Sequence, residues 1–155
     1  MNKMIEHITY SSATETDTPY LTHLLAQLFS IEKDFEPNAT KQEQGLALLL
    51  KNQQTASIQV ARDASGNVIG MVSVQLVIST AQGSASAWIE DMVIDASFRG
   101  QGIGKHLLQR TLAWAKDHGA TRAQLLVDTE NAGALAYYEH LGWESTQLQA
   151  RKIFL

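Results

Sequence analysis

A glycine-rich turn flanked by basic residues is the segment whose composition best suits chemistry. It reads RGQGIGK, from Arg99 to Lys105, and it joins a strand-like segment to a helical one. Glycine has no Cβ, so the backbone can turn tightly and approach a ligand closely. The first N–H groups of a helix have no intrahelical acceptor, and the helix dipole adds partial positive charge at the same point. The sequence therefore predicts an anion site, with phosphate as the expected ligand.

The glycine spacing indicates which phosphate ligand to expect. A Walker A loop needs a glycine, four residues, and then Gly-Lys-Ser or Gly-Lys-Thr. Here Arg99 stands where the first glycine should be, and His106 stands where Ser or Thr should follow Gly104-Lys105. The segment is therefore not a Walker A loop. The dinucleotide fingerprint G-x-G-x-x-G fails in both frames, because Lys105 or Leu107 falls where the third glycine should be. The pattern that fits is Arg-x-x-Gly-x-Gly.

Arg-x-x-Gly-x-Gly at a strand-to-helix turn resembles the pyrophosphate-binding motif of the GNAT N-acetyltransferase superfamily, whose ligand is acetyl-coenzyme A. A second segment, NAGALAYYEHLGW from Asn131 to Trp143, resembles the other signature of that superfamily. The resemblance covers roughly residues 85–143. It implies an acyltransferase that moves an acetyl group from acetyl-CoA to a primary amine of a small molecule or peptide, by direct transfer in a ternary complex.

The resemblance also indicates which residues would hold the coenzyme. The turn would bind the pyrophosphate, and the main chain of the preceding strand would bind the pantetheine arm. Asn131 matches a position that can hydrogen-bond this arm, although a helix cap explains an asparagine there equally well. The coenzyme-binding residues expected on this basis are Met92, Val93, Ile94, Arg99, Gly100, Gln101, Gly102, Gly104, Lys105, Asn131 and Tyr138.

Acetyl transfer also needs a base, because an alkyl amine with a pKa of about 10.4 is almost entirely ammonium at neutral pH. A carboxylate near the acceptor can take the proton directly or through water. Glu90 and Asp91 lie on the strand that leads to the glycine-rich turn. Neighbouring strand residues point to opposite faces, so only one of the two can face the acceptor unless a bulge changes the alternation. We predict Glu90 as the base, with Asp91 as the second candidate; either can instead be an ordinary solvated strand residue.

Tyr138 is the expected general acid, because its position in the second signature matches the tyrosine that approaches the coenzyme sulfur in many GNAT enzymes. Its hydroxyl would protonate the leaving thiolate or hydrogen-bond the thioester; without the signature it would be a packing residue. Two other functions stay open. One is a GNAT-like module that senses acyl-coenzyme A without chemistry. The other is a nucleotide-binding α/β domain in which Asp128 takes the ribose hydroxyls, although the glycine spacing counts against it.

The composition limits the partners and the location. With 155 residues, 45% hydrophobic and 18% charged, the chain suits one domain over residues 1–155. A net charge of −4 argues against nucleic acid and anionic membranes as partners and mildly favours a cationic acceptor.

The absence of cysteine excludes disulfides and a cysteine acyl-enzyme. No metal site is expected, since no two of the five histidines have a metal-ligand spacing. With no signal peptide or membrane-spanning stretch, we expect a cytoplasmic protein.

Hydrophobic periodicity predicts the order strand, two helices, three strands, helix, strand, helix, strand. Asp17-Thr18-Pro19 should cap the first helix with an N1 proline, and Thr40 with Glu43 should form a capping box for the second. The expected segments are a strand over 4–10, helices from 18 and over 40–51, strands over 57–61, 68–79 and 85–95, a helix from 103, a strand over 122–128, a helix over 132–141 and an extended segment from Trp143.

This order matches a mixed α/β fold of the GNAT kind. The resemblance implies a central mixed sheet, an antiparallel N-terminal meander plus a parallel strand pair at the coenzyme cleft, with about four flanking helices. It also implies that the loop after the first helix, Ile31–Glu36, and the turn Thr80–Ser84 select the acceptor, although Ile31–Glu36 is better explained as an ordinary solvated helix end. Only Glu144–Leu155 follow the second signature, so the last strand must be short or pair elsewhere. A free edge can pair with a second copy, which makes a homodimer one expectation.

Overall fold

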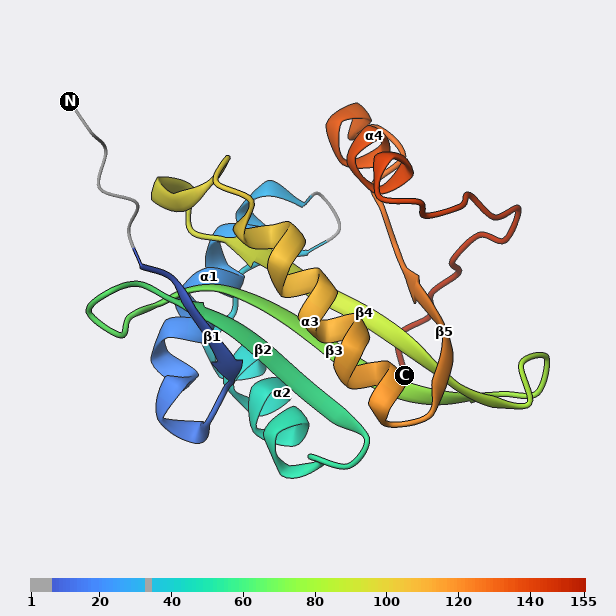
Figure 1. Cartoon of the computed structure of the whole chain (residues 1–155), viewed down its shortest axis with the longest axis horizontal. Coiled ribbons are helices and arrows are strands. Elements are labelled where there is room, and N and C mark those ends of the chain that lie inside the picture. The colour runs from blue at the N-terminus through green and yellow to red at the C-terminus, as the bar shows by residue number, and fades with distance from the viewer. Residues whose placement is uncertain (1–6, 33–34) are drawn as a thin grey trace. The chain divides into compact units, whose positions relative to one another are not determined.

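Five strands form a sheet in the order β1-β2-β3-β4-β5 (Figure 1). The computed structural model describes residues 7–32 and 35–155, and the chain divides into two compact units, Met1–Gln124 and Leu125–Leu155. The strands are β1 Thr9–Ser12, β2 Ala56–Arg62, β3 Val68–Ser79, β4 Ser84–Ile94 and β5 Ala120–Leu125. The helices are α1 Thr18–Ile31, α2 Ala39–Lys51, α3 Ile103–Asp117 and α4 Ala132–His140, with short 3-10 helices η1 Glu15–Asp17 and η2 Ala96–Phe98.

The strand pairing is mixed, as predicted. Strands β1 to β4 pair antiparallel with their neighbours, which confirms the meander of β2, β3 and β4. Helix α3 then carries the chain back, so that β5 joins β4 in parallel. The starts of these two strands lie together, because the hydroxyl oxygens of Ser84 and Thr121 are 2.6 Å apart. The predicted mixed α/β fold is therefore confirmed.

Helices cover both faces of the sheet, with α3 on one face and α1 and α2 on the other (Figure 1). On the second face, buried Leu21 of α1 and Leu46 of α2 belong to one core cluster with Met71 of β3. The neighbouring Gly70 points to the first face, where a Cβ would lie 3.2 Å from Leu107 of α3. Alternation along β3 then turns Ser73 toward the same side as Met71. This is the side on which the candidate site forms.

Helix α2 begins two residues earlier than the predicted capping box. Asn38 is its N-cap residue, and the Asn38 side chain accepts a hydrogen bond from the Lys41 backbone N–H at 3.1 Å. Thr40 already lies inside the helix, so the prediction of a Thr40–Glu43 box is wrong. Asparagine is among the best N-cap residues, and the first suitable oxygen along the chain was enough to start the helix.

Helix α1 begins at Thr18, which places Pro19 at its second position rather than its first. Asp17 stands at the N-cap but makes no side-chain capping bond to α1. Its carboxylate oxygens instead accept two hydrogen bonds from the Arg62 guanidinium of β2, both at 2.8 Å. The start of α1 is therefore tied to the sheet.

The two ends of the chain differ from the prediction. Strand β1 shares only Thr9 and Tyr10 with the predicted strand over 4–10, of which residues 4–6 lie outside the described residues. The described residues after α4, 141–155, form no strand, so the last predicted strand is wrong. A strand needs a partner and apolar cover, but Leu148, Ile153 and Phe154 are more than 80% exposed.

In the described part of the chain, no helix is long and apolar enough to cross a bilayer.

Candidate active site

A β-bulge in β4 lies at the centre of the candidate site. Ser73 of β3 pairs with Glu90, whereas Met71 pairs with Val93, so two steps along β3 match three along β4. Asp91 has a φ of 54°, a left-handed conformation that aspartate adopts more readily than most residues. The bulge breaks the alternation of faces, and Glu90 and Asp91 both line one pocket. The exception allowed for in the prediction, a bulge that changes the alternation of faces, is therefore present.

Asp91 is held in an environment that changes its acidity. Its carboxylate accepts a hydrogen bond from the Ser73 hydroxyl at 3.0 Å, and Ser73 is only 2% exposed. Burial disfavours the charged form and raises the pKa of Asp91 to about 6; the Ser73 hydrogen bond opposes this rise and the charge of Glu90 adds to it. A carboxyl group with such a pKa is mostly ionised at neutral pH and is still a useful base.

Glu90 has a different environment on the same strand. Its side chain is exposed, and its carboxylate accepts a hydrogen bond from the indole N–H of Trp88. Trp88 is half-buried. Its hydrogen bond orients the Glu90 carboxylate. The two carboxyl groups of the pair thus differ in hydration: Asp91 is withdrawn from water and Glu90 meets it.

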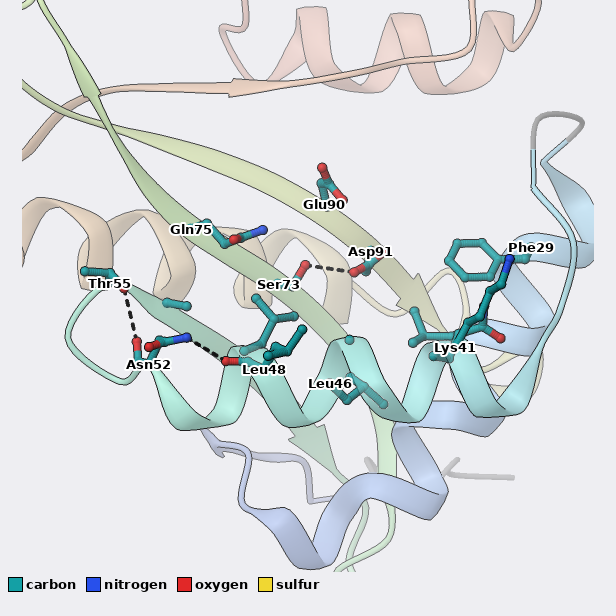
Figure 2. Close-up of a pocket in the computed structure, with 15 residues that line it drawn as sticks. Phe29, Lys41, Leu46, Leu48, Asn52, Thr55, Ser73, Gln75, Glu90 and Asp91 are labelled. Atoms are coloured by element: carbon teal, nitrogen blue, oxygen red, sulfur yellow. Dashed lines mark hydrogen bonds between the residues drawn. The ribbon is translucent and has the colours of Figure 1, made fainter. Parts of the chain in front are cut away.

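The pocket that both carboxylates line has a volume of about 440 Å³ and lies between α2 and the sheet (Figure 2). Figure 2 shows Asp91 and Ser73 on the sheet side, with Lys41 and Phe29 toward one end and Asn52 toward the other. The helical wall is largely apolar and includes Leu25, Leu46 and Leu49. None of the described residues in the predicted acceptor segments, 31–36 and 80–84, lines this pocket. Helix α2, which the sequence did not single out, supplies much of it.

The remaining residues of β4 connect the bulge to the glycine-rich turn. Met92, Val93 and Ile94 complete the strand, and the Val93 side chain is only 4% exposed in the core. The Arg99 side chain folds back onto the strand, where its Nε donates to the Ile94 carbonyl oxygen at 3.0 Å. Because its side chain is in the core, Val93 can offer only its main chain to a ligand; Met92 and Ile94 are half-buried.

The turn has the backbone that the sequence predicts. Gly100 and Gly102 both have a φ of 78°, in the left-handed region that glycine adopts without strain. Gly102 is the N-cap residue of α3, and Gly104 is the second residue of that helix. Gln101 and Lys105 are exposed, as are the first two glycines. The first amides of a 15-residue helix thus lie at an open, positively charged turn.

Asp95 is a structural residue of this turn that the sequence analysis missed. One carboxylate oxygen accepts from the Ser97 backbone N–H at 2.9 Å, and the other accepts from the Gln27 side-chain amide of α1 at 3.0 Å. The Gln27 hydrogen bond, followed by that of Ser97, lowers the pKa of Asp95. Aspartate two residues before serine at a strand end is a local capping signal, but the link to Gln27 spans 68 residues. Asp95 fixes the path from β4 into the turn.

The two predicted site residues of the second signature lie in the second compact unit. Asn131 is the N-cap residue of α4 and accepts from the Ala134 backbone N–H at 3.0 Å, so it acts as a helix cap. The half-buried Tyr138 packs edge-on against Tyr137 and Trp143, with ring centroids 5.4 and 5.9 Å apart. Asp128, the residue of the nucleotide-binding alternative, accepts from the Glu130 backbone N–H at 2.9 Å and so closes a turn.

The fold and the motif residues of this chain have counterparts in known proteins. A model of the acetyltransferase (GNAT) family matches residues 19–143. The chain belongs to this family. The match includes both GNAT signatures, the bulged strand β4 and helix α2.

Individual GNAT proteins show the same likeness. The chain is 32% identical over 87 residues to an uncharacterized N-acetyltransferase of Methanocaldococcus jannaschii, covering 56% of this chain and 38% of that one. It is 31% identical over 88 residues to glucosamine 6-phosphate N-acetyltransferase of Trypanosoma brucei brucei, covering 56% and 58%. The solved structure of an aminoglycoside N-acetyltransferase in complex with CoA superposes with a TM-score of 0.79 at 18% identity, over 100% and 97% of the two chains. That last likeness shows the fold.

The extent of these matches limits what can be transferred to this chain. These two curated relatives match over little more than half of this chain, and the matched part is 38% and 58% of their own lengths. In the residues that the structure describes, no group of three or more His, Asp or Glu side chains could hold a metal ion.

Proposed function

We propose that this chain is an acetyl-CoA-dependent N-acetyltransferase that acetylates a primary amine by direct transfer in a ternary complex. The observation that carries the proposal is the bulge in β4, which brings two carboxylates of unequal hydration into one pocket. The same strand runs on into the turn that suits a diphosphate. Family membership and the curated relatives named as N-acetyltransferases support this reaction class over nucleotide binding.

The residues of the turn fit the coenzyme. Gly100, Gln101, Gly102, Gly104 and Lys105 would donate to the pyrophosphate from the main chain, and Arg99 would position it. The pantetheine arm would run along the main chain of Met92, Val93 and Ile94, with Asn131 as a further donor. The left-handed glycines and the exposed turn support this assignment. When bound, acetyl-CoA supplies the thioester carbon that the amine attacks.

The carboxylate pair would make the amine nucleophilic. Lowering the pKa of an ammonium group to neutrality corresponds to about 4 to 5 kcal/mol, so a nearby base is essential. The sequence alone favours Glu90, but the burial of Asp91 and its pKa of about 6 support Asp91 as the proton acceptor. Glu90, at the hydrated side, would attract the ammonium group and relay the proton to water.

The transfer step then balances as follows. The amine nitrogen attacks the thioester carbon, an N–C bond forms, and the C–S bond breaks to release coenzyme A. Backbone donors near Val93 would polarise the carbonyl oxygen, as an oxyanion hole does. Tyr138 would give a proton to the thiolate, as its place in the second signature suggests. The ammonium form of the acceptor loses two protons in all. The first would leave through Asp91 and Glu90 to water before the attack, and the second, lost from the nitrogen as the N–C bond forms, would replace the proton that Tyr138 gives to the thiolate.

Release of free thiol tests the proposal. Purified protein should bind acetyl-CoA, shown by titration calorimetry, and release coenzyme A when primary amines are added. Acetylated amine, identified by mass spectrometry, should form in equal amount. Tight coenzyme binding without turnover of any amine would support the sensor module instead, and binding of NAD in place of CoA would support the nucleotide-binding domain.

Two variants sharpen this test. Tyr138→Phe removes the proposed acid and should lower kcat much more than it lowers the affinity for CoA. Tyr137→Phe is the matched control on the same helix, since it removes a hydroxyl outside the proposed machinery. Equal effects of the two changes would remove Tyr138 from the mechanism.

A further inference from the structure

The acceptor pocket combines charges of both signs. Lys41, in the first turn of α2, is the one cation among the described residues that line it, and Glu90 and Asp91 are the acids. Figure 2 shows the Lys41 side chain reaching up from α2 toward the end where Phe29 lies, with Asp91 on the sheet side. No ion pair joins Lys41 to another described residue. Lys41 is exposed and lines the pocket, so its ammonium group can reach a ligand there.

This charge pattern discriminates between classes of amine. A monoamine would be attracted to the carboxylates, but each further positive charge on the acceptor would also meet Lys41. Like charges held close together cost free energy, particularly where protein walls displace water. An anionic group on the acceptor would instead pair with Lys41 in a charge-assisted hydrogen bond. The pocket thus disfavours polycationic acceptors.

The size and walls of the pocket narrow the class further. A volume of about 440 Å³ is near the small end of the range for small-molecule sites. The apolar side chains of Leu46 and Leu49 can cover only a short carbon skeleton. The acceptor should then be a compact molecule whose two charged groups lie at different places in the pocket.

We propose that the acceptor is a small primary amine that also carries an anionic group, either a carboxylate or a phosphate monoester, with the amine beside Asp91 and the anion on Lys41. This inference rests on the proposed acetyltransferase function of the same pocket. Both kinds of anion present oxygen atoms to the ammonium group, so the shared chemistry is a negatively charged oxygen group.

Matched pairs of amines test the inference in the thiol-release assay. Propylamine is compared with β-alanine, which carries a carboxylate, and ethanolamine with its phosphate monoester. If the pocket accepts the anion of a pair, the anionic amine should have a kcat/KM roughly 10- to 100-fold higher than its uncharged counterpart. This is the usual effect of a hydrogen bond to a charged group. The pair with the larger ratio identifies the anion. Spermidine should be a poor acceptor.

Variants of Lys41 show whether this residue makes the distinction. Lys41→Gln should remove most of the preference through a higher KM for the anionic amine, and Lys41→Arg should keep it. Lys51→Gln is the matched control, because it removes the same charge from the other end of α2, outside the pocket. Turnover of all amines without a preference for anions, or a preference untouched by Lys41→Gln, would overturn the inference and leave the acetyltransferase proposal standing. No turnover with any amine would overturn both.

Discussion

Asp91 combines three features that seldom occur together at one residue. Its backbone is left-handed, its half-buried carboxyl group has a pKa raised by burial, and a buried serine donates a hydrogen bond to it. Each feature costs the folded state free energy or restrains the side chain. Such residues are concentrated at functional sites. Two predictions at the residue scale separate the proposed role of Asp91 in catalysis from its cost to stability.

The first prediction concerns activity. Asp91→Asn keeps the shape of the side chain but cannot accept the proton, so kcat/KM should fall by about 100- to 10,000-fold. In the unchanged protein, kcat/KM should rise with pH through about 6, as Asp91 becomes ionised. The variant should lack this rise. Steady-state thiol release over a pH series measures both. If Glu90→Gln causes the large loss and Asp91→Asn does not, Glu90 is the base.

The second prediction concerns stability. The pKa of Asp91 is raised from 3.8 to about 6 on folding, so the folded state binds this proton more tightly than the unfolded state. The contribution of Asp91 is therefore unfavourable above about pH 6 and disappears below about pH 4. Asp91→Asn should raise the free energy of unfolding by about 1 to 3 kcal/mol at neutral pH and change it little in acid. Urea denaturation at the two pH values is the measurement; an unstabilised variant at neutral pH would contradict the argument.

At the scale of elements, β4 and the start of α3 act as one unit. The bulge sets the carboxylates, and the strand continues to the turn through a short 3-10 helix capped by Asp95. Gly102 then begins α3 in a left-handed conformation. A non-glycine residue there costs about 1 to 2 kcal/mol, whatever space surrounds it.

The third prediction uses this cost. Gly102→Ala should weaken binding of CoA by about 5- to 30-fold. In the free variant the turn can relax out of the left-handed conformation, and CoA binding would have to force the alanine back into it. Gly83→Ala is the matched control: it has a φ of 67°, it lies in the turn between β3 and β4, and a Cβ has open space at both sites. Both variants should lose similar stability. Titration calorimetry should show weaker coenzyme binding only for Gly102→Ala, and equal weakening would remove the turn from the coenzyme site.

At the scale of the whole molecule, long-range contacts hold the N-terminal helix to the sheet on which the site is built. The Asp17–Arg62 ion pair is the main polar example: Asp17 is 5% exposed, and 45 residues separate the two partners. The Arg62 hydrogen bond is the largest influence on Asp17 and lowers the pKa of Asp17 despite its burial. Stability from this pair is therefore present above the ordinary pKa of 3.8 and is lost as the pH falls through the lower value of the folded state.

The fourth prediction tests the pair. Arg62→Met leaves the Asp17 carboxylate buried without its partner and should lower the free energy of unfolding by about 3 to 5 kcal/mol at neutral pH. Adding Asp17→Asn should restore part of this loss, since no buried charge remains. Chemical denaturation of both single variants and the double variant gives the coupling energy. Additive effects would mean that the pair contributes little.

Local signals explain which parts of the fold could be predicted. Period-two and helical patterns predicted the bounds of β2, β3, β4 and α3 closely, because each of these elements buries one face or one stripe of side chains. The glycine-rich turn was predicted for the same reason, since Gly100 and Gly102 need no distant partner to adopt their conformation. The prediction of a C-terminal strand was wrong because a strand depends on a neighbouring strand. Apolar residues such as Ile153 do not specify which segment that neighbour would be.

Residue type and spacing along the chain were enough to predict the order of the elements as far as α4, the anion turn at Arg99–Lys105 and the two candidate carboxylates Glu90 and Asp91. Only the tertiary structure decided that both carboxylates share one pocket and that Asp91 is the less hydrated. Those properties arise from the pairing of β4 with β3, from Ser73 eighteen residues away and from α2 across the pocket. Burial and register are properties of contacts between distant segments, and no local pattern encodes them.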